Sequence, residues 1–189
     1  MHAGHASAAV FIAGWTLMTI AMMLPTSAPL ILMFHRMKDG SPGAVSLLVA
    51  GYLAVWIAFG AVVYVLSLLL SGLVEGALAS AAILLMAGLF QFSPWKYACL
   101  DKCRSPMAFL MGHWKGSALR LGAEHGAFCV GCCWSLMLVM FAVGTGSVAW
   151  MLVLGIVMAA EKNLPWGRKL GAPLGVVLIA GAVAVLLAR

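Results

Sequence analysis

Residues 124–137 read EHGAFCVGCCWSLM and hold three of the chain's five cysteines, together with a histidine, a glutamate and a methionine. An α-helix has about 3.6 residues per turn, so residues three and four positions apart are neighbours on its surface. His125, Cys129, Cys132 and Cys133 therefore fall on one side of a helix. The rest of the stretch is apolar, which predicts a helix that crosses a membrane. The pattern predicts an all-α fold in which this helix carries the functional side chains.

The composition is that of an integral membrane protein. The chain has 189 residues, of which 65% are hydrophobic and 8% are charged, whereas a soluble domain carries about 25% charged residues. The length excludes a large domain outside the membrane. The net charge of +6 is therefore not a sign of nucleic-acid binding, because basic residues in a membrane protein mark its cytoplasmic side.

The hydrophobic pattern predicts a polytopic transmembrane helical bundle of about six spans, forming one domain over residues 1–189. A span requires about 20 predominantly apolar residues. The predicted spans are residues 8–34, 44–70, 77–92, 121–143, 147–162 and 173–188. The first is interrupted by Pro25 and Pro29, so we expect a kink there.

The basic residues predict the orientation of these spans. The loops after the first, third and fifth spans hold Arg36, Lys38, Lys96, Lys102, Arg104, Lys115, Arg120, Lys162, Arg168 and Lys169. The opposite face has only Arg189. Basic loops remain in the cytoplasm, so both termini are predicted to be external.

The cysteine helix is predicted to face other protein helices rather than lipid. If Arg120 marks the cytoplasmic boundary, Cys132 lies about 18 Å along the helix, near the middle of the bilayer. Gly122, Gly126 and Gly131 lie among the ligand-type residues. Small residues allow a neighbouring helix to approach closely.

Three interpretations of the cysteine helix remain open at this point. The cysteines are small buried hydrophobic residues, or they bind a metal, or Cys129 and Cys132 form a C-x-x-C thiol–disulfide centre. Thiolate and thioether ligands suit copper(I), and thiolate with imidazole suits zinc. His125 and the nearby methionines favour a metal site, because thiol exchange requires neither.

A second cysteine pair lies in the polar stretch that is predicted to form a cytoplasmic loop. Cys99 and Cys103 have C-x-x-x-C spacing, which places both thiols on one side of a helical turn. A structural disulfide is disfavoured in the reducing cytoplasm. The pair is either incidental or a metal-exchange site, and it reaches the cysteine helix only if the loop folds back into the bundle.

Two carboxylates are predicted near the cytoplasmic ends of their spans, where an ionisable residue must be paired or hydrated. Glu161 either forms an interfacial ion pair with Lys162, or joins Glu124 and His125 in a cytoplasmic mouth for a cation. Gln91, near the end of the third span, is a further candidate for that mouth.

The first helix offers thioether groups beside a break. Pro25 removes a backbone hydrogen bond and frees a carbonyl group inside the membrane. Met22 and Met23 precede it and are either core filler or soft metal ligands. They would lie opposite the thiols if this helix packs against the cysteine helix.

Several motifs together resemble the signatures of one family. Residues 21–25 resemble A-M-M-x-P, residues 88–106 resemble G-L-x-Q-x-x-P-x-K-x-x-C-L-x-x-C-R-x-P, and residues 125–137 resemble H-G-x-x-C-x-G-C-C-W-x-L-M; Glu161 and Lys162 also fit. The chain is similar to bacterial integral membrane proteins described as predicted metal-binding membrane proteins, a domain of unknown function. The resemblance covers most of the chain. It implies a multi-pass protein of the bacterial inner (plasma) membrane that binds a metal, without indicating a reaction.

We therefore predict an inner-membrane protein that handles, delivers or transports copper(I), with zinc as the alternative metal. The predicted metal ligands are Cys129, Cys132, Cys133, His125, Cys99, Cys103, Met22, Met23, Glu124 and Glu161. The predicted partners are the lipid bilayer and a metallochaperone or membrane enzyme complex, and no nucleic acid. The sequence has no P-loop and no P-type ATPase motif, so any transport would be passive or driven by a partner.

Two functions of other classes stay open. A membrane thiol–disulfide relay would use Cys129 with Cys132 inside the membrane and Cys99 with Cys103 in the cytoplasm. An accessory subunit of a membrane complex would account for the near absence of long loops.

Overall fold

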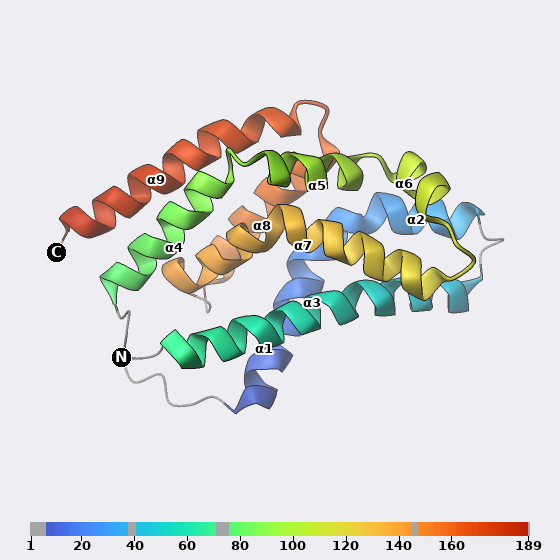
Figure 1. Ribbon diagram of the computed structural model, residues 1–189, viewed down its shortest axis with the longest axis horizontal. Helices are drawn as coiled ribbons and strands as arrows, with labels where there is room; N and C mark the ends of the chain where they lie inside the picture. Colours follow the sequence, from blue (N-terminus) through green and yellow to red (C-terminus); the bar gives the residue numbers. More distant parts are fainter. Residues whose placement is uncertain (1–6, 38–40, 71–75, 145–146, 189) are drawn as a thin grey trace.

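The computed structural model describes residues 7–37, 41–70, 76–144 and 147–188, and every regular element in these ranges is a helix (Figure 1). The α-helices are α1 (Ala8–Met23), α2 (Ala28–Met37), α3 (Pro42–Leu70), α4 (Ala77–Phe90), α5 (Pro94–Arg104), α6 (Pro106–His113), α7 (Ala118–Val143), α8 (Val148–Asn163) and α9 (Gly171–Leu187). Two short 3₁₀ helices, η1 (Pro25–Ser27) and η2 (Gly167–Leu170), precede α2 and α9. The all-α prediction is confirmed for these ranges.

The described helices include three to five candidate membrane spans. Pro42–Leu70, Ala118–Val143 and Gly167–Leu187 are each long and apolar enough to cross a membrane. Two bent pairs also qualify, α1 with residues 25–37 at 40° and α4 with α5 at 68°. These helices are compatible with a membrane location. The six-span topology and the external termini stay predictions, and residues 1–6 and 189 lie outside the described residues.

Helix α7 is the central helix of the bundle. It packs against α3, α4, α5, α6 and α8, and Figure 1 shows it between α3 on one side and α5 and α6 on the other. Half of its most apolar window is buried, compared with 17% for α3. The side chain of Ser117 accepts a hydrogen bond from the backbone N–H of Arg120 at its start, and the helix ends at Gly144, whose φ is +104°. The cysteine helix is therefore the buried core of the fold.

Glycines bring the backbones of α3 and α7 into direct contact. A Cβ atom on Gly122 would collide with the carbonyl oxygen of Leu48, and a Cβ atom on Gly51 would collide with that of Leu119. One turn further, a Cβ atom on Gly126 would lie 3.0 Å from the carbonyl oxygen of Tyr52. The predicted close approach at the glycines of this helix is confirmed, and it places α3 beside Cys129.

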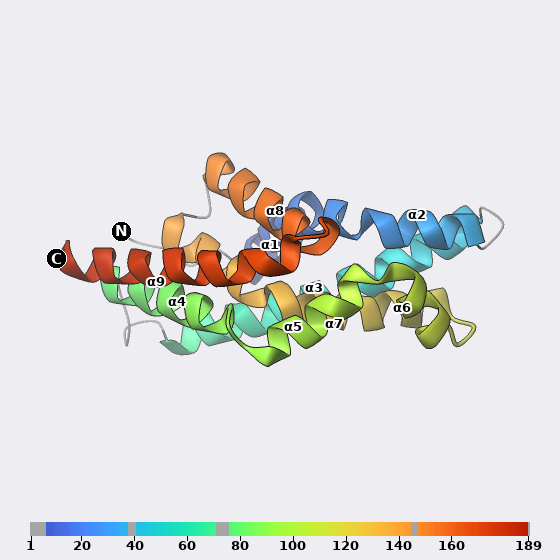
Figure 2. The ribbon, with the colours of Figure 1, turned by 90° about the horizontal axis from the view of Figure 1, so that it is seen from above.

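The polar stretch between the third and fourth predicted spans forms two helices, α5 and α6, rather than an open loop. The side chain of Ser93 accepts from the backbone N–H of Trp95, and Pro94 occupies the first turn of α5, a position that suits its fixed φ. Helix α5 packs against α7 and α8, and Figure 2 shows it lying along α7. The stretch therefore folds back into the bundle and carries Cys99 and Cys103 with it.

A buried ion pair holds α5 in this position. The ammonium group of Lys96, which is fully buried, donates to Glu161 Oε1 of α8 at 2.6 Å and to the side-chain oxygen of Gln91. Arg104 donates to the backbone carbonyls of Glu161, Leu164 and Pro165 at the end of α8. Both ends of α5 are thus attached to α8.

The buried lysines correct the predicted charge distribution. Lys96 and Lys162 are predicted as loop charges, but both are buried because each finds hydrogen-bond acceptors inside the bundle. Lys38 lies outside the described residues. The exposed basic residues of the described ranges are Arg36, Lys102, Lys115, Arg120, Arg168 and Lys169. The positive-inside argument therefore rests on fewer charges than the sequence alone indicates.

Replacing Gly122 should test the contact between α3 and α7. In Gly122→Ala the new methyl group meets the Leu48 backbone, so the helices must separate and the protein should lose about 1–3 kcal/mol of stability. The control is Gly14→Ala in α1, where a Cβ atom has nothing within 4 Å. Unfolding by SDS in mixed micelles, followed by circular dichroism, gives both values. Equal stability of the two variants would contradict the proposed helix contact.

Breaking the ion pair between Lys96 and Glu161 should be far more damaging than breaking an exposed pair. Lys96→Met leaves a buried carboxylate without its cation, which costs about 3–5 kcal/mol. Arg168→Met removes an exposed pair with Asp101, 3.0 Å long, and should cost less than about 1 kcal/mol. The same micelle unfolding measurement compares them. A small effect of Lys96→Met would show that the pair does not hold α5 in place.

Candidate metal centre

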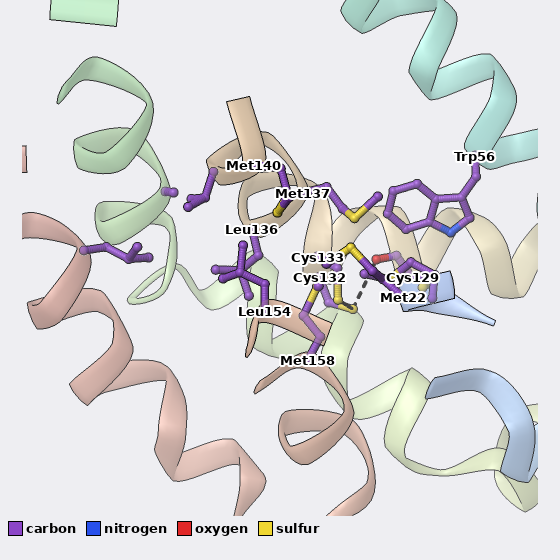
Figure 3. Close-up of a cluster of buried hydrophobic side chains, with 14 of the residues drawn as sticks. Met22, Trp56, Cys129, Cys132, Cys133, Leu136, Met137, Met140, Leu154 and Met158 are labelled. Carbon is purple, nitrogen blue, oxygen red and sulfur yellow. Dashed lines mark hydrogen bonds between the residues drawn. The ribbon is translucent and has the colours of Figure 1, made fainter. Parts of the chain in front are cut away.

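The thiols of α7 and α5 meet inside the bundle, and Figure 3 shows Cys132 and Cys133 of α7 side by side in the buried core. Cys132 Sγ lies 3.3 Å from Cys133 Sγ on α7 and 3.9 Å from Cys103 Sγ on α5. Cys132 and Cys133 are buried, and all five cysteines are free thiols. We call Cys103, Cys132 and Cys133 the thiol cluster. It joins one cysteine of the predicted loop pair to two of the cysteine helix.

Cys99 lies against the same face of α7. A Cβ atom built on Gly131 would lie 2.6 Å from Cys99 Sγ, so this sulfur occupies the space that a side chain at position 131 would take. The glycine therefore allows α5 to approach next to Cys132. Whether the loop cysteines reach the cysteine helix is open from the sequence, and the structure shows that they do.

Thioether groups surround the thiol cluster. Met22 and Met23 from α1, Met137 and Met140 from α7, and Met158 from α8 are buried in the same core cluster as the cysteines. In Figure 3 the side chain of Met158 extends from α8 toward Cys132. Helix α1 packs mainly against α3 and α8, yet Met22 and Met23 lie in the same buried cluster as the cysteines; their role as ligands stays a prediction. Sequence analysis missed Met158, which has no distinguishing motif around it.

Cys129 has a different environment from the other two cysteines of α7. The ammonium group of Lys162 donates to Cys129 Sγ at 2.9 Å and to Thr26 Oγ1 at 3.0 Å, and Tyr52 Oη lies 3.0 Å from the same sulfur. Two unit positive charges 4 Å apart repel by about 4 kcal/mol at an effective dielectric constant of about 20. The buried ammonium group therefore opposes a metal cation on Cys129.

The contact between Lys162 and Cys129 corrects the expected pairing of Glu161 with Lys162. Glu161 pairs with Lys96 of α5, whereas Lys162 points to α7 and α1. Consecutive residues of a helix do not face each other. That rule was the signal in the sequence that these two side chains belong to different networks.

The predicted cytoplasmic mouth is not assembled from Glu124, His125 and Glu161. Glu124 is partly exposed and pairs with Arg120 at 2.9 Å, within one turn of α7. His125 Nε2 lies 3.3 Å from Ser27 Oγ, and its ring stacks on Tyr52. The three side chains thus have separate partners, and Gln91 joins the network of Glu161 through Lys96.

A cavity of about 260 Å³ lies next to the thiol cluster. Cys103 and His125 both line it, together with Thr26, Ser27 and Lys162. Cys103 therefore contacts the cavity on one side and Cys132 on the other. This geometry gives a small molecule or ion a route to the buried thiols.

The atoms that the candidate site offers to a metal ion are mainly sulfur. Within the ranges that the structure describes, no group of three or more His, Cys, Asp or Glu side chains is placed to hold one metal ion. Thiolate and thioether sulfur suit copper(I), and close thiols among buried methionines supply those atoms.

Comparison with known proteins agrees with the chemistry of these donors. Neither the curated proteins nor the solved structures include a match to this chain. Residues 12–185, most of the chain, match the family described as PpoB2: Copper chaperone. The protein with this buried thiol cluster therefore belongs to the PpoB2 copper chaperone family.

Proposed function

We propose that this chain binds copper(I) at the thiol cluster within the bacterial inner membrane and delivers the ion to a partner protein. The observation that carries the proposal is the 3.3 Å separation of the Cys132 and Cys133 sulfurs, with Cys103 Sγ 3.9 Å from Cys132. Membership of a copper chaperone family supports copper as the metal. Sulfur donors, thiolate and thioether, suit copper(I), and the buried methionines add thioether groups near the thiols.

Cys103 is proposed as the ligand that receives the ion and transfers it inward. It is half-buried, lines the cavity and lies beside the fully buried Cys132. The ion would exchange from one sulfur to the next, with Met22, Met23, Met137 and Met158 supplying thioether contacts. Because neighbouring sulfurs share the ion, each exchange step stays reversible.

The direction and the partner are proposed from charge and composition. The exposed basic residues support a cytoplasmic position for the end of α2, the segment from α5 to the start of α7, and the segment between α8 and α9. The copper would then be passed within the bilayer to a membrane enzyme complex, or received from a metallochaperone. The chain has no nucleotide-binding motif, so the gradient of affinity between donor and partner drives the movement.

The second candidate function is a thiol–disulfide relay, and the contact between the Cys103 and Cys132 sulfurs supports it. Cys103 and Cys132 come from different helices and their sulfurs lie 3.9 Å apart, whereas a disulfide bond is about 2 Å long. Oxidation would therefore join α5 to α7. This pair differs from the predicted couples of Cys129 with Cys132 and of Cys99 with Cys103.

Removing the buried thiol pair should abolish tight copper binding. The double variant Cys132→Ser/Cys133→Ser should bind copper(I) at least tenfold more weakly, since loss of even an outer-shell partner costs about 10–100-fold. Cys129→Ser should have a smaller effect, because Lys162 already opposes a cation on that sulfur. Anaerobic competition with a chromophoric copper(I) chelator, with metal content by mass spectrometry, gives the affinities. Equal affinity of the wild type and the double variant would overturn the proposed site.

Removing the receiving thiol should slow loading without emptying the site. Cys103→Ser should reduce the rate of copper uptake by about tenfold or more, while the final copper content stays near that of the wild type. Cys99→Ser is the matched control on the same helix, since Cys99 is not among the cavity-lining residues. Stopped-flow chelator release measures the rates. A redox relay predicts instead a disulfide between Cys103 and Cys132 in cells, which thiol trapping would detect.

A further inference from the structure

The cavity beside Cys103 has a chemically distinctive lining. It is bounded by ten residues, of which Arg104, His125 and Lys162 carry basic groups and Thr26, Ser27 and Asn163 carry neutral polar groups. No aspartate or glutamate is among these ten residues. Its volume of about 260 Å³ is close to the lower end of ligand pockets, which measure about 300–1,000 Å³.

The two fixed cations of the lining have no carboxylate partner among the described residues. The ion pairs in those ranges involve Lys96, Arg120 and Arg168. Arg104 donates to three backbone carbonyls, and Lys162 donates to a hydroxyl group and to sulfur. The carbonyl partners of Arg104 are neutral and leave its positive charge uncancelled, whereas the Cys129 sulfur beside Lys162 supplies a counter-charge only as a thiolate. An ionic charge that lacks a counter-charge is costly in a membrane protein, so the cavity favours an anion.

His125 supplies a second, independent observation. The residue is 3% exposed, and its buried Nδ1 atom has no hydrogen-bond partner among the described residues. Nε2 lies 3.3 Å from Ser27 Oγ. When Nε2 accepts from that hydroxyl group, Nδ1 carries the proton and is a free donor. A buried donor without an acceptor is costly, and a rotation of the ring, which already lines the cavity, would bring Nδ1 to a carboxylate bound there.

These charges disfavour the entrance of a bare copper ion. A monovalent cation near Arg104 and Lys162 is repelled by both charges, and strongly so, because the effective dielectric constant inside a protein is far below that of water. The same charges attract a carrier with a negative charge. Because Cys103 also lines the cavity, the carrier's own soft ligand would be delivered next to a thiol.

We propose that the cavity binds a small anionic thiol, one that carries at least one carboxylate group and brings copper(I) to Cys103. This inference rests on the proposed copper function and adds that copper(I) reaches Cys103 as a complex with the anionic thiol. In the transfer step the Cys103 sulfur bonds to the ion as the bond between the ion and the carrier sulfur breaks. The Cys103 thiol proton passes to the departing carrier thiolate, and copper remains in the +1 state throughout.

Three small thiols whose terminal groups carry a negative charge, no charge or a positive charge test the proposal. Copper(I) is presented to the whole purified protein, in uncharged detergent, as its complex with 3-mercaptopropionate, 2-mercaptoethanol or cysteamine. Uptake from the anionic carrier should be about tenfold faster than from the neutral one at low salt, in line with electrostatic focusing, and slowest from the cationic one. Added salt should reduce the difference. Equal rates from all three, with normal final copper content, would overturn the anionic carrier and leave the copper site standing.

A variant with altered cavity charge provides the control. Asn163→Asp adds a negative charge to the lining at an exposed position, and should remove most of the advantage of the anionic carrier. Asn163→Ser, which is neutral, should retain it. Both variants should hold the wild-type amount of copper at equilibrium, because neither alters a sulfur ligand. An unchanged carrier preference in Asn163→Asp would overturn the proposal.

Binding of a thioether analogue tests the cavity without copper. 3-(Methylthio)propionate keeps the carboxylate but has no thiol to exchange, and it should bind the metal-free protein saturably and more weakly to Asn163→Asp, as measured by ligand-detected NMR. Failure to bind would overturn the anion site even if copper binds. Binding of the analogue to a protein that takes up no copper would overturn the copper function and its transfer step, and would leave an anion site alone.

Discussion

The buried pair of Lys96 and Glu161 is the interaction on which the rest of the site depends. It joins α5 to α8 at 2.6 Å with both side chains almost completely inaccessible to solvent. Helix α5 is short and polar and buries only Lys96 and Leu100 completely. The ion pair and the contacts of Arg104 with the end of α8 supply its attachment to α8. Cys99 and Cys103 reach α7 because the helix that carries them is fixed in this way.

The cysteines of α7 divide into two kinds because of the charges around them. Lys162 donates to Cys129, while Cys132 and Cys133 lie beside each other and beside Cys103. The positive charge of Lys162 therefore lies in direct contact with Cys129 and not with the other group. The three cysteines are equivalent in a helical-face argument, and only the partners from α5 and α8 distinguish them.

Much of the fold was predictable from residues on a single helix. The apolar pattern and the glycines of α7 predict a buried central helix with a close neighbour, and Gly122 against Leu48 confirms it. Burial of Lys96 and Lys162 was not predictable, because their acceptors come from positions 65 and 33 residues away. The cavity escaped prediction for the same reason. Its walls combine α5, α7, α8 and the residues after α1, which no local pattern relates.

Glu161 and Lys162 are adjacent on α8 but contact different helices. Glu161 pairs with Lys96 of α5, and Lys162 donates to Cys129 of α7. A turn of α8 about its own axis would move both side chains away from their partners together. The attachment of α5 and the position of the ammonium group beside Cys129 therefore both depend on one rotational setting of α8.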